Sequence, residues 1–157
     1  MSDGPEVAAS PRSLAELRTL LAEQPELLPV AGGTDLMVAD PLERSAAGRV
    51  VDLTRVPELR GVAETADGGL EIGAATPFSE LRRHPLVRAR YPALAAAAAV
   101  VGGWQIQNRA TVGGNVASRA RSTGRESPAG LALATLPPTV ARFWTSTRPA
   151  ASETTCR

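Results

Sequence analysis

The sequence contains no lysine, one cysteine and one histidine, and these scarcities limit its chemistry. With Cys156 as its one cysteine, the chain forms no internal disulfide. One thiol is also too few for a metal site built from cysteine thiolates. His84 alone does not make a histidine metal site. Because these nucleophiles and metal ligands are scarce, we predict no catalytic residue and no metal ligand in the chain. Any redox chemistry would come from a bound cofactor.

Long apolar runs are also missing. The alanine-rich stretch YPALAAAAAVVGG (91–103) is too short to cross a bilayer, so we expect no membrane span. The first residues, MSDGPEVAASPRS, carry acid and no basic segment of the kind that opens a secretory signal. We therefore expect a cytoplasmic protein. At 157 residues and 43% hydrophobic content, the chain is long enough to bury a core.

The charge is uneven along the chain. All 17 basic residues are arginine, and from position 119 onward six arginines face two acids, which gives 6 − 2 = +4. The preceding part carries 11 − 14 = −3. A basic tail suits nucleic acid, but this one lacks lysine, interleaved aromatic residues and any recognisable nucleic-acid-binding pattern. We expect no nucleic-acid partner.

The periodicity predicts a mixture of helices and strands. Ser13 and Glu16 form a capping box at the start of a helix within 10–26. Thr76 is expected to cap another helix within 76–87, with Pro77 at its first position, and a third covers 91–103. Strands are expected at 27–33, 48–56 and 69–76, and a strand turning through glycines at 110–118. There is no strand–GxGxxG–helix unit and no P-loop lysine, so the pattern favours α+β over a Rossmann fold.

Two similar glycine loops stand out, AGGTD (31–35) and TVGGN (111–115). Glycine reaches positive φ and lets backbone N–H groups converge on an anion. The two loops are therefore candidate cradles for the two phosphates of a pyrophosphate, with Arg109 as a candidate source of positive charge. A Gly-Gly pair is more often an ordinary turn, and Asp35 more often a turn or capping acid than a ligand, so both interpretations stay open from the residues alone.

Four segments in register resemble the FAD-binding subunit or domain of the molybdenum hydroxylases, the family of xanthine dehydrogenase and of the carbon monoxide dehydrogenase medium subunit. They are SLAELRTLLAEQPELLPVAGGTDL (13–36), VVDLTRVPELRGV (50–62), GLEIGAATPFSEL (69–81) and GGWQIQNRATVGGNVAS (102–118).

The resemblance implies a PCMH-type FAD-binding fold of two α+β subdomains, of which this chain has the first and the start of a truncated second. It also implies FAD as cofactor, with the pyrophosphate between the two loops. The residues carried over are, for the first loop, Ala31, Gly32, Gly33, Thr34 and Asp35, and for the second, Thr111, Val112, Gly113, Gly114 and Asn115.

In such enzymes the substrate is hydroxylated at a molybdopterin centre on a large subunit. Electrons then pass through 2Fe-2S clusters, on a small subunit, to FAD and on to NAD or another acceptor. Both subunits are therefore implied partners, and this chain is an oxidoreductase subunit expected to be inactive alone. Two alternatives stay open: a truncated remnant that binds nothing tightly, and a small protein-interaction domain.

The chain departs from the family pattern in two places. Gln107 stands where the family usually has arginine. After Ser118 the family register is lost, and SPAG (127–130) occurs displaced, without the aspartate that usually follows. We expect residues 1–118 to form the FAD-binding domain and residues 119–157 an irregular or disordered tail. Its two candidate origins are a shifted reading frame and a linker to a lost domain.

Overall fold

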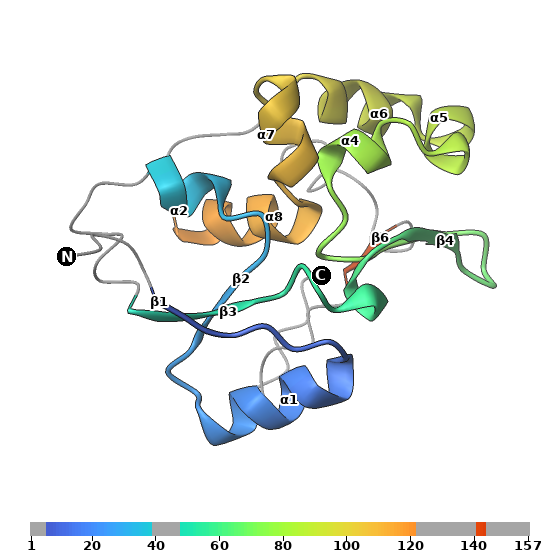
Figure 1. Cartoon of the computed structure of the whole chain (residues 1–157). Helices are drawn as coiled ribbons and strands as arrows, with labels where there is room; N and C mark the ends of the chain where they lie inside the picture. The colour runs from blue at the N-terminus through green and yellow to red at the C-terminus, as the bar shows by residue number, and fades with distance from the viewer. Residues whose placement is uncertain (1–5, 39–47, 122–140, 144–157) are drawn as a thin grey trace.

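The computed structural model describes residues 6–38, 48–121 and 141–143, which form two small sheets surrounded by helices (Figure 1). The strands are β1 (Glu6–Ala9), β2 (Leu28–Val30), β3 (Arg49–Asp52), β4 (Val62–Glu64), β5 (Leu70–Ile72) and β6 (Ala141–Phe143). The helices are α1 (Leu14–Glu23), α2 (Thr34–Val38), α4 (Phe78–Leu81), α5 (Pro85–Arg90), α6 (Pro92–Ala99), α7 (Trp104–Arg109) and α8 (Val112–Arg121), with a 3₁₀ turn η1 at Pro57–Leu59.

The first sheet is parallel, in the order β1-β3-β2. Its central strand, β3, buries both Val50 and Val51, which point to opposite faces. The two successive valines fit a central parallel strand that is covered on both faces. In Figure 1, α1 lies below this sheet and α2 and α8 lie above it. Because the strands are parallel, β1, β2 and β3 all end at one edge.

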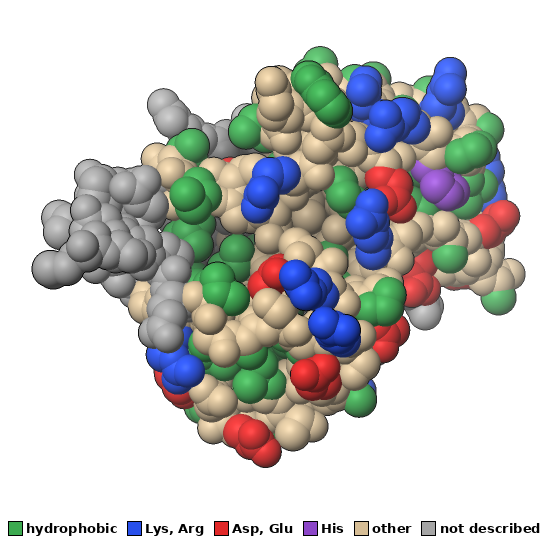
Figure 2. Space-filling view, viewed as in Figure 1, with side chains coloured by type: hydrophobic (Ala, Val, Ile, Leu, Met, Phe, Trp, Pro, Cys, Tyr) green, Lys and Arg blue, Asp and Glu red, His purple; other side chains and the backbone are tan. Residues whose placement is uncertain are grey.

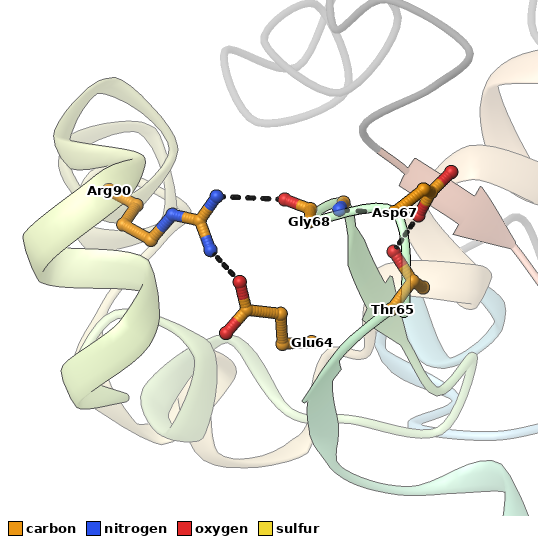
Figure 3. Close-up of polar contacts among 6 residues, drawn as sticks. Glu64, Thr65, Asp67, Gly68 and Arg90 are labelled. Carbon is orange, nitrogen blue, oxygen red and sulfur yellow. Dashed lines mark hydrogen bonds and ion pairs between the residues drawn. The ribbon is translucent and has the colours of Figure 1, made fainter.

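The second sheet has the order β4-β5-β6, with β4 antiparallel and β6 parallel to β5. The β4–β5 hairpin is held to α5 by Arg90, whose guanidinium donates to the Glu64 carboxylate and, at 2.8 Å, to the Gly68 carbonyl (Figure 3). Within the hairpin turn, the Thr65 hydroxyl donates to Asp67. These contacts fix the second sheet against the helices that follow it.

Two apolar clusters fill the interior. One lies between α1 and the first sheet and is made of Leu17, Leu27, Val51, Val56, Leu59 and Ala75. The other lies among the second sheet and the helices after it and is made of Leu70, Ile72, Phe78, Leu81, Val87, Leu94, Ala98, Ala110 and Val112. Ala75 belongs to the first cluster and Phe78 to the second, so segment 73–78 runs from one cluster to the other.

Several sequence predictions are confirmed and others are wrong. Ser13 does cap α1, accepting from the Glu16 N–H at 3.1 Å, while the Glu16 carboxylate accepts from the N–H of Arg12. Thr76 caps nothing: α4 begins at Phe78 after Pro77, and the buried Thr76 hydroxyl both accepts from and donates to the backbone of Gly61.

The helix predicted within 76–87 is interrupted. It divides into α4 and α5, because Pro85 opens a new helix. A proline at the first position of a helix is tolerated, whereas inside a helix it removes a backbone donor.

The largest error concerns 110–118, which is not a strand. Those residues lead into and form most of α8, which runs to Arg121, beyond the domain boundary predicted after Ser118. Of the predicted tail, Arg119–Arg121 belong to α8 and Ala141–Phe143 form β6. Residues 122–140 and 144–157 lie outside the described residues, so the predicted domain boundary and the origin of the tail stay predictions.

Candidate flavin site

The first glycine loop connects the end of β2 to α2. Val30 accepts from the Leu53 N–H at 2.9 Å, which ties the end of β2 to the turn after β3. The chain then reverses through Gly33, whose φ of +68° lies in the left-handed region that favours glycine. The Gly33 carbonyl accepts from Met37 at 3.0 Å, so α2 starts immediately after the turn.

Backbone donors are free in this first loop. Within residues 6–38 and 48–121, the N–H groups of Gly33, Thr34 and Asp35 have no hydrogen-bond acceptor. The first N–H groups of a helix have no partner inside that helix. The half-buried Thr34 adds a hydroxyl, and the Asp35 side chain is exposed. The loop therefore offers several donors to an anion.

The second glycine loop is built differently. Its N–H groups already have acceptors: Val112 donates to Thr76 at 3.0 Å, and Gly113 donates to Ala74 at 2.8 Å. Gly114 donates to the Thr111 hydroxyl oxygen at 3.2 Å, as at a helix N-cap. The predicted turn of free donors is therefore wrong for this loop, since its glycines lie in the first turn of α8 and neither has positive φ.

The two loops nevertheless touch. A Cβ placed on Gly32 would lie 1.9 Å from the carbonyl oxygen of Arg109 and 3.0 Å from the Ala110 Cα. Gly32 is itself buried, so the backbone entering the second loop packs directly on the first loop. Figure 1 shows the same arrangement, with α2 beside α8. Sequence positions almost eighty residues apart are thus in contact, and the cofactor site that the resemblance implied at this junction stays a prediction.

One polar atom at this junction lacks a partner. The Oδ1 atom of Asn115, in the first turn of α8, is buried and accepts no hydrogen bond from the described residues. A buried acceptor without a donor is costly, which makes it a candidate contact for a ligand hydroxyl or N–H. Arg109, in the last turn of α7, is exposed and has no acidic partner among the described residues.

Gln107, which departs from the family pattern, has a structural role. Its side chain is buried, and its Nε2 donates to the carbonyls of Ala99 at 2.9 Å and Gly102 at 3.3 Å. It thereby holds the turn between α6 and α7, on the opposite side of α7 from solvent. Gln107 is uncharged and lies in α7, outside both loops, so it supplies no positive charge to them.

Sequence reasoning missed the groups that anchor the second loop. The carbonyls of Ala74 and Thr76 hold the start of α8, and a Cβ on Gly113 would lie 2.7 Å from the Ala74 Cβ. The small residues of GAA (73–75) are the signal in the sequence for this close approach. Their role depends on Gly113, which lies 113 − 74 = 39 residues after Ala74 in the chain, and periodicity does not reveal such a partner.

The sequence matches a known family over most of its length. The family described as "FAD binding domain in molybdopterin dehydrogenase" matches residues 6–140. The chain belongs to this family. FAD is accordingly the cofactor by which the family is defined, and the α+β FAD-binding fold predicted from the resemblance is confirmed. The match also continues past Ser118, where the sequence analysis placed the end of the family register.

Individual relatives agree. The chain is 38% identical over 116 residues to a xanthine dehydrogenase FAD-binding subunit of Escherichia coli O157:H7, covering 74% of this chain and 40% of that subunit. It is 37% identical over 111 residues to the carbon monoxide dehydrogenase medium chain of Hydrogenophaga pseudoflava, covering 69% of this chain and 38% of the relative. The chain thus spans about 40% of the length of these relatives.

Solved structures show the same fold. A carbon monoxide dehydrogenase structure from Hydrogenophaga pseudoflava superposes with a TM-score of 0.63 at 34% identity, covering 73% of this chain and 40% of that one. Quinoline 2-oxidoreductase from Pseudomonas putida 86 gives a TM-score of 0.64 at 31% identity, covering 74% and 41%. In the part of this chain that the structure describes, no helix is long and apolar enough to cross a membrane.

Proposed function

We propose that this chain holds FAD at the junction of its two glycine loops and serves as the flavin-binding part of a molybdenum hydroxylase. The observation that carries the proposal is the contact of Gly32 with the Arg109 carbonyl, because it packs the first loop, with its available donors, against the end of α7, directly before the second loop. The family assignment supplies the cofactor, and the loop geometry supplies a place for it.

The two loops have different tasks in this proposal. The N–H groups of Gly33, Thr34 and Asp35, with the Thr34 hydroxyl, would bind phosphate oxygens of the FAD pyrophosphate. Thr111, Val112, Gly113 and Gly114 would line the other side by close packing, since their N–H groups or hydroxyl are engaged within the protein. Asn115 would accept a hydrogen bond from a hydroxyl or N–H of the cofactor.

The bound flavin would accept electrons from iron–sulfur clusters and pass them to NAD or another acceptor. The residues of this chain would bind and orient the cofactor; none of them is assigned a catalytic step. The partners that complete such an enzyme are a molybdopterin-binding large subunit and a 2Fe-2S small subunit. The purified chain alone is therefore expected to show no substrate hydroxylation, and hydroxylase turnover without partners would contradict the assignment.

Flavin binding itself is the direct test. FAD added to the purified chain should lose fluorescence on binding, with a saturable titration. Gly33→Val should abolish this binding, because valine resists the left-handed φ and crowds the free donors. Gly68→Val is the matched control: Gly68 also has positive φ, at +79°, but lies in the β4–β5 turn away from the loops.

The control separates loss of the site from loss of the fold. Both variants carry a comparable backbone strain, so both should lose a similar amount of stability. Only Gly33→Val should lose FAD. If the wild-type chain binds no FAD, or if the two variants lose FAD equally, the proposed site is wrong and the remnant or interaction-domain alternatives remain.

A further inference from the structure

Three arginines lie at the edge of the parallel sheet at which the first glycine loop also lies. A shallow surface cavity, largely open to solvent, is lined by five exposed residues: Arg12, Thr54, Arg55, Pro57 and Arg60. Arg12 follows β1, Thr54 and Arg55 follow β3, and Arg60 follows η1. The carboxyl edge of a parallel sheet, where loops from several strands converge, is where open α/β sheets commonly bind ligands.

This cavity is distinct from the flavin site but adjacent to it. None of its lining residues belongs to either glycine loop. The two places are connected through the backbone, because Leu53, directly before Thr54, donates to Val30, directly before the first loop. The proposed flavin function uses none of the three arginines.

The charges of the cavity are only partly compensated. Arg60 pairs with Glu80 at 2.8 Å. The guanidinium groups of Arg12 and Arg55, in contrast, have no hydrogen-bond or ion-pair partner among the described residues, and both side chains are exposed. No carboxylate of the described residues lines the cavity. Guanidinium groups from three chain segments thus face one space.

Carboxylates surround this space without entering it. Glu16 accepts from the Arg12 N–H at 2.7 Å, and Glu58 accepts from the Leu14 N–H at 3.1 Å. The hydrogen bond from the Leu14 N–H lowers the pKa of the Glu58 carboxyl. Figure 2 shows basic and acidic side chains interspersed over the middle of this face. These two nearby carboxylates disfavour a long polyanion more than a small anion that contacts only the arginines.

We propose that the cavity lined by Arg12, Arg55 and Arg60 binds a small phosphate-bearing molecule, at a site separate from the flavin and occupied at the same time. Phosphate fits better than a carboxylate because its several oxygens match guanidinium groups arriving from different directions, whereas one arginine suffices for a carboxylate.

The test uses inorganic pyrophosphate as probe, titrated into the full chain by isothermal calorimetry at low ionic strength, where the charges are least screened. With FAD bound, so that the loop site is occupied, we expect saturable binding of pyrophosphate with one site per chain. The double variant Arg12→Gln/Arg55→Gln should weaken it about tenfold or more, since two charge-assisted contacts are lost. The matched control, Arg83→Gln/Arg88→Gln, also removes two exposed arginines, from the segment of α4 and α5, and should change the affinity less than about twofold.

The same titration is repeated without FAD in Gly33→Val. Unchanged pyrophosphate affinity there supports a separate site, and it remains informative even if FAD binding itself fails. Displacement of pyrophosphate by FAD would assign the arginines to the flavin phosphates and overturn the proposal. Absence of saturable binding, equal weakening in the control double variant, or tighter binding of heparin than of pyrophosphate through the same arginines would also overturn it.

Discussion

The Gly-Gly pairs of the two loops, Gly32-Gly33 and Gly113-Gly114, are alike in sequence and unlike in structure. Each pair lies within two residues of a threonine and a second polar residue. The first pair forms a left-handed turn followed by N–H groups that no described residue accepts, and the second opens a ten-residue helix with its N–H groups engaged. Conformational freedom explains Gly33. The absence of a side chain explains Gly32 and Gly113, which lie against other backbone atoms.

The difference teaches what a glycine pair does and does not predict. Both pairs do mark close approach, since one packs on Arg109 and the other on Ala74. Whether the N–H groups are left for a ligand depends on the carbonyls nearby. Ala74 and Thr76 provide such acceptors to the second loop, and no described residue provides them to the first.

The largest effect is expected for Gly32→Ala. The new Cβ would lie 1.9 Å from a backbone carbonyl oxygen, and a carbonyl held by α7 and α8 does not move aside easily. We expect a loss of about 3 kcal/mol or more in the free energy of unfolding, measured by chemical denaturation, together with loss of FAD binding.

Gly103→Ala is the control for this change. Its Cβ would lie at an ordinary 3.6 Å from the Gln105 side chain, and its φ of −76° suits alanine. A stability near that of the wild type is expected. Equal stability of the two variants would show that the loops do not pack on each other.

Gly113→Ala should give the next largest effect. Its Cβ would lie 2.7 Å from the Ala74 Cβ and 2.8 Å from the Ala74 carbonyl oxygen, which also accepts the Gly113 N–H. We expect a loss of about 1–3 kcal/mol, because α8 must shift away from segment 73–76. Thermal or urea unfolding measures it, and a wild-type midpoint would contradict the close packing.

Much of this architecture was predictable from local sequence. The Ser13–Glu16 capping box, the apolar run of β3 and the alternation of Leu70 and Ile72 in β5 each correspond to an element in the structure. In each of these cases the deciding interactions lie within a few residues, so the pattern contains them. The two loops were also identified, although their donors were predicted to be alike.

The remaining features depend on distant partners. Segment 110–118 was predicted as a strand that turns through glycines, but Thr111 caps a helix whose first N–H groups donate to the carbonyls of Ala74 and Thr76. The strand β6 pairs with β5 from about seventy residues away in the sequence. The arginine cavity likewise unites residues that follow β1, β3 and η1. The periodicity of a short segment does not encode contacts between residues so far apart in the sequence.

Thr111→Val tests the cap that distinguishes the second loop. Valine keeps the volume of this buried side chain but removes the hydroxyl oxygen that accepts from Gly114. We expect a loss of about 1 kcal/mol in unfolding free energy and faster hydrogen exchange at the Gly114 amide. Thr19→Val, on the exposed face of α1, should change stability by only a few tenths of a kcal/mol. If both variants behave alike, the cap contributes nothing.

The smallest effects come from the same substitution placed once in each loop, Gly33→Ala and Gly114→Ala. At Gly33 there is space, since the nearest atom to a new Cβ is 3.6 Å away on Val30, so only the left-handed φ is penalised, by about 1 kcal/mol. At Gly114 the helical backbone suits alanine, while the Cβ would lie 3.0 Å from the Thr111 hydroxyl, and these two effects offset each other to within about 0.5 kcal/mol. Gly33→Asn should recover part of the loss at position 33, because asparagine tolerates this conformation better than alanine does. Urea unfolding of the three variants side by side measures the differences. If Gly33→Ala and Gly114→Ala destabilise the protein equally, or asparagine at position 33 is no better than alanine, then the left-handed turn is not what sets the first loop apart from the second.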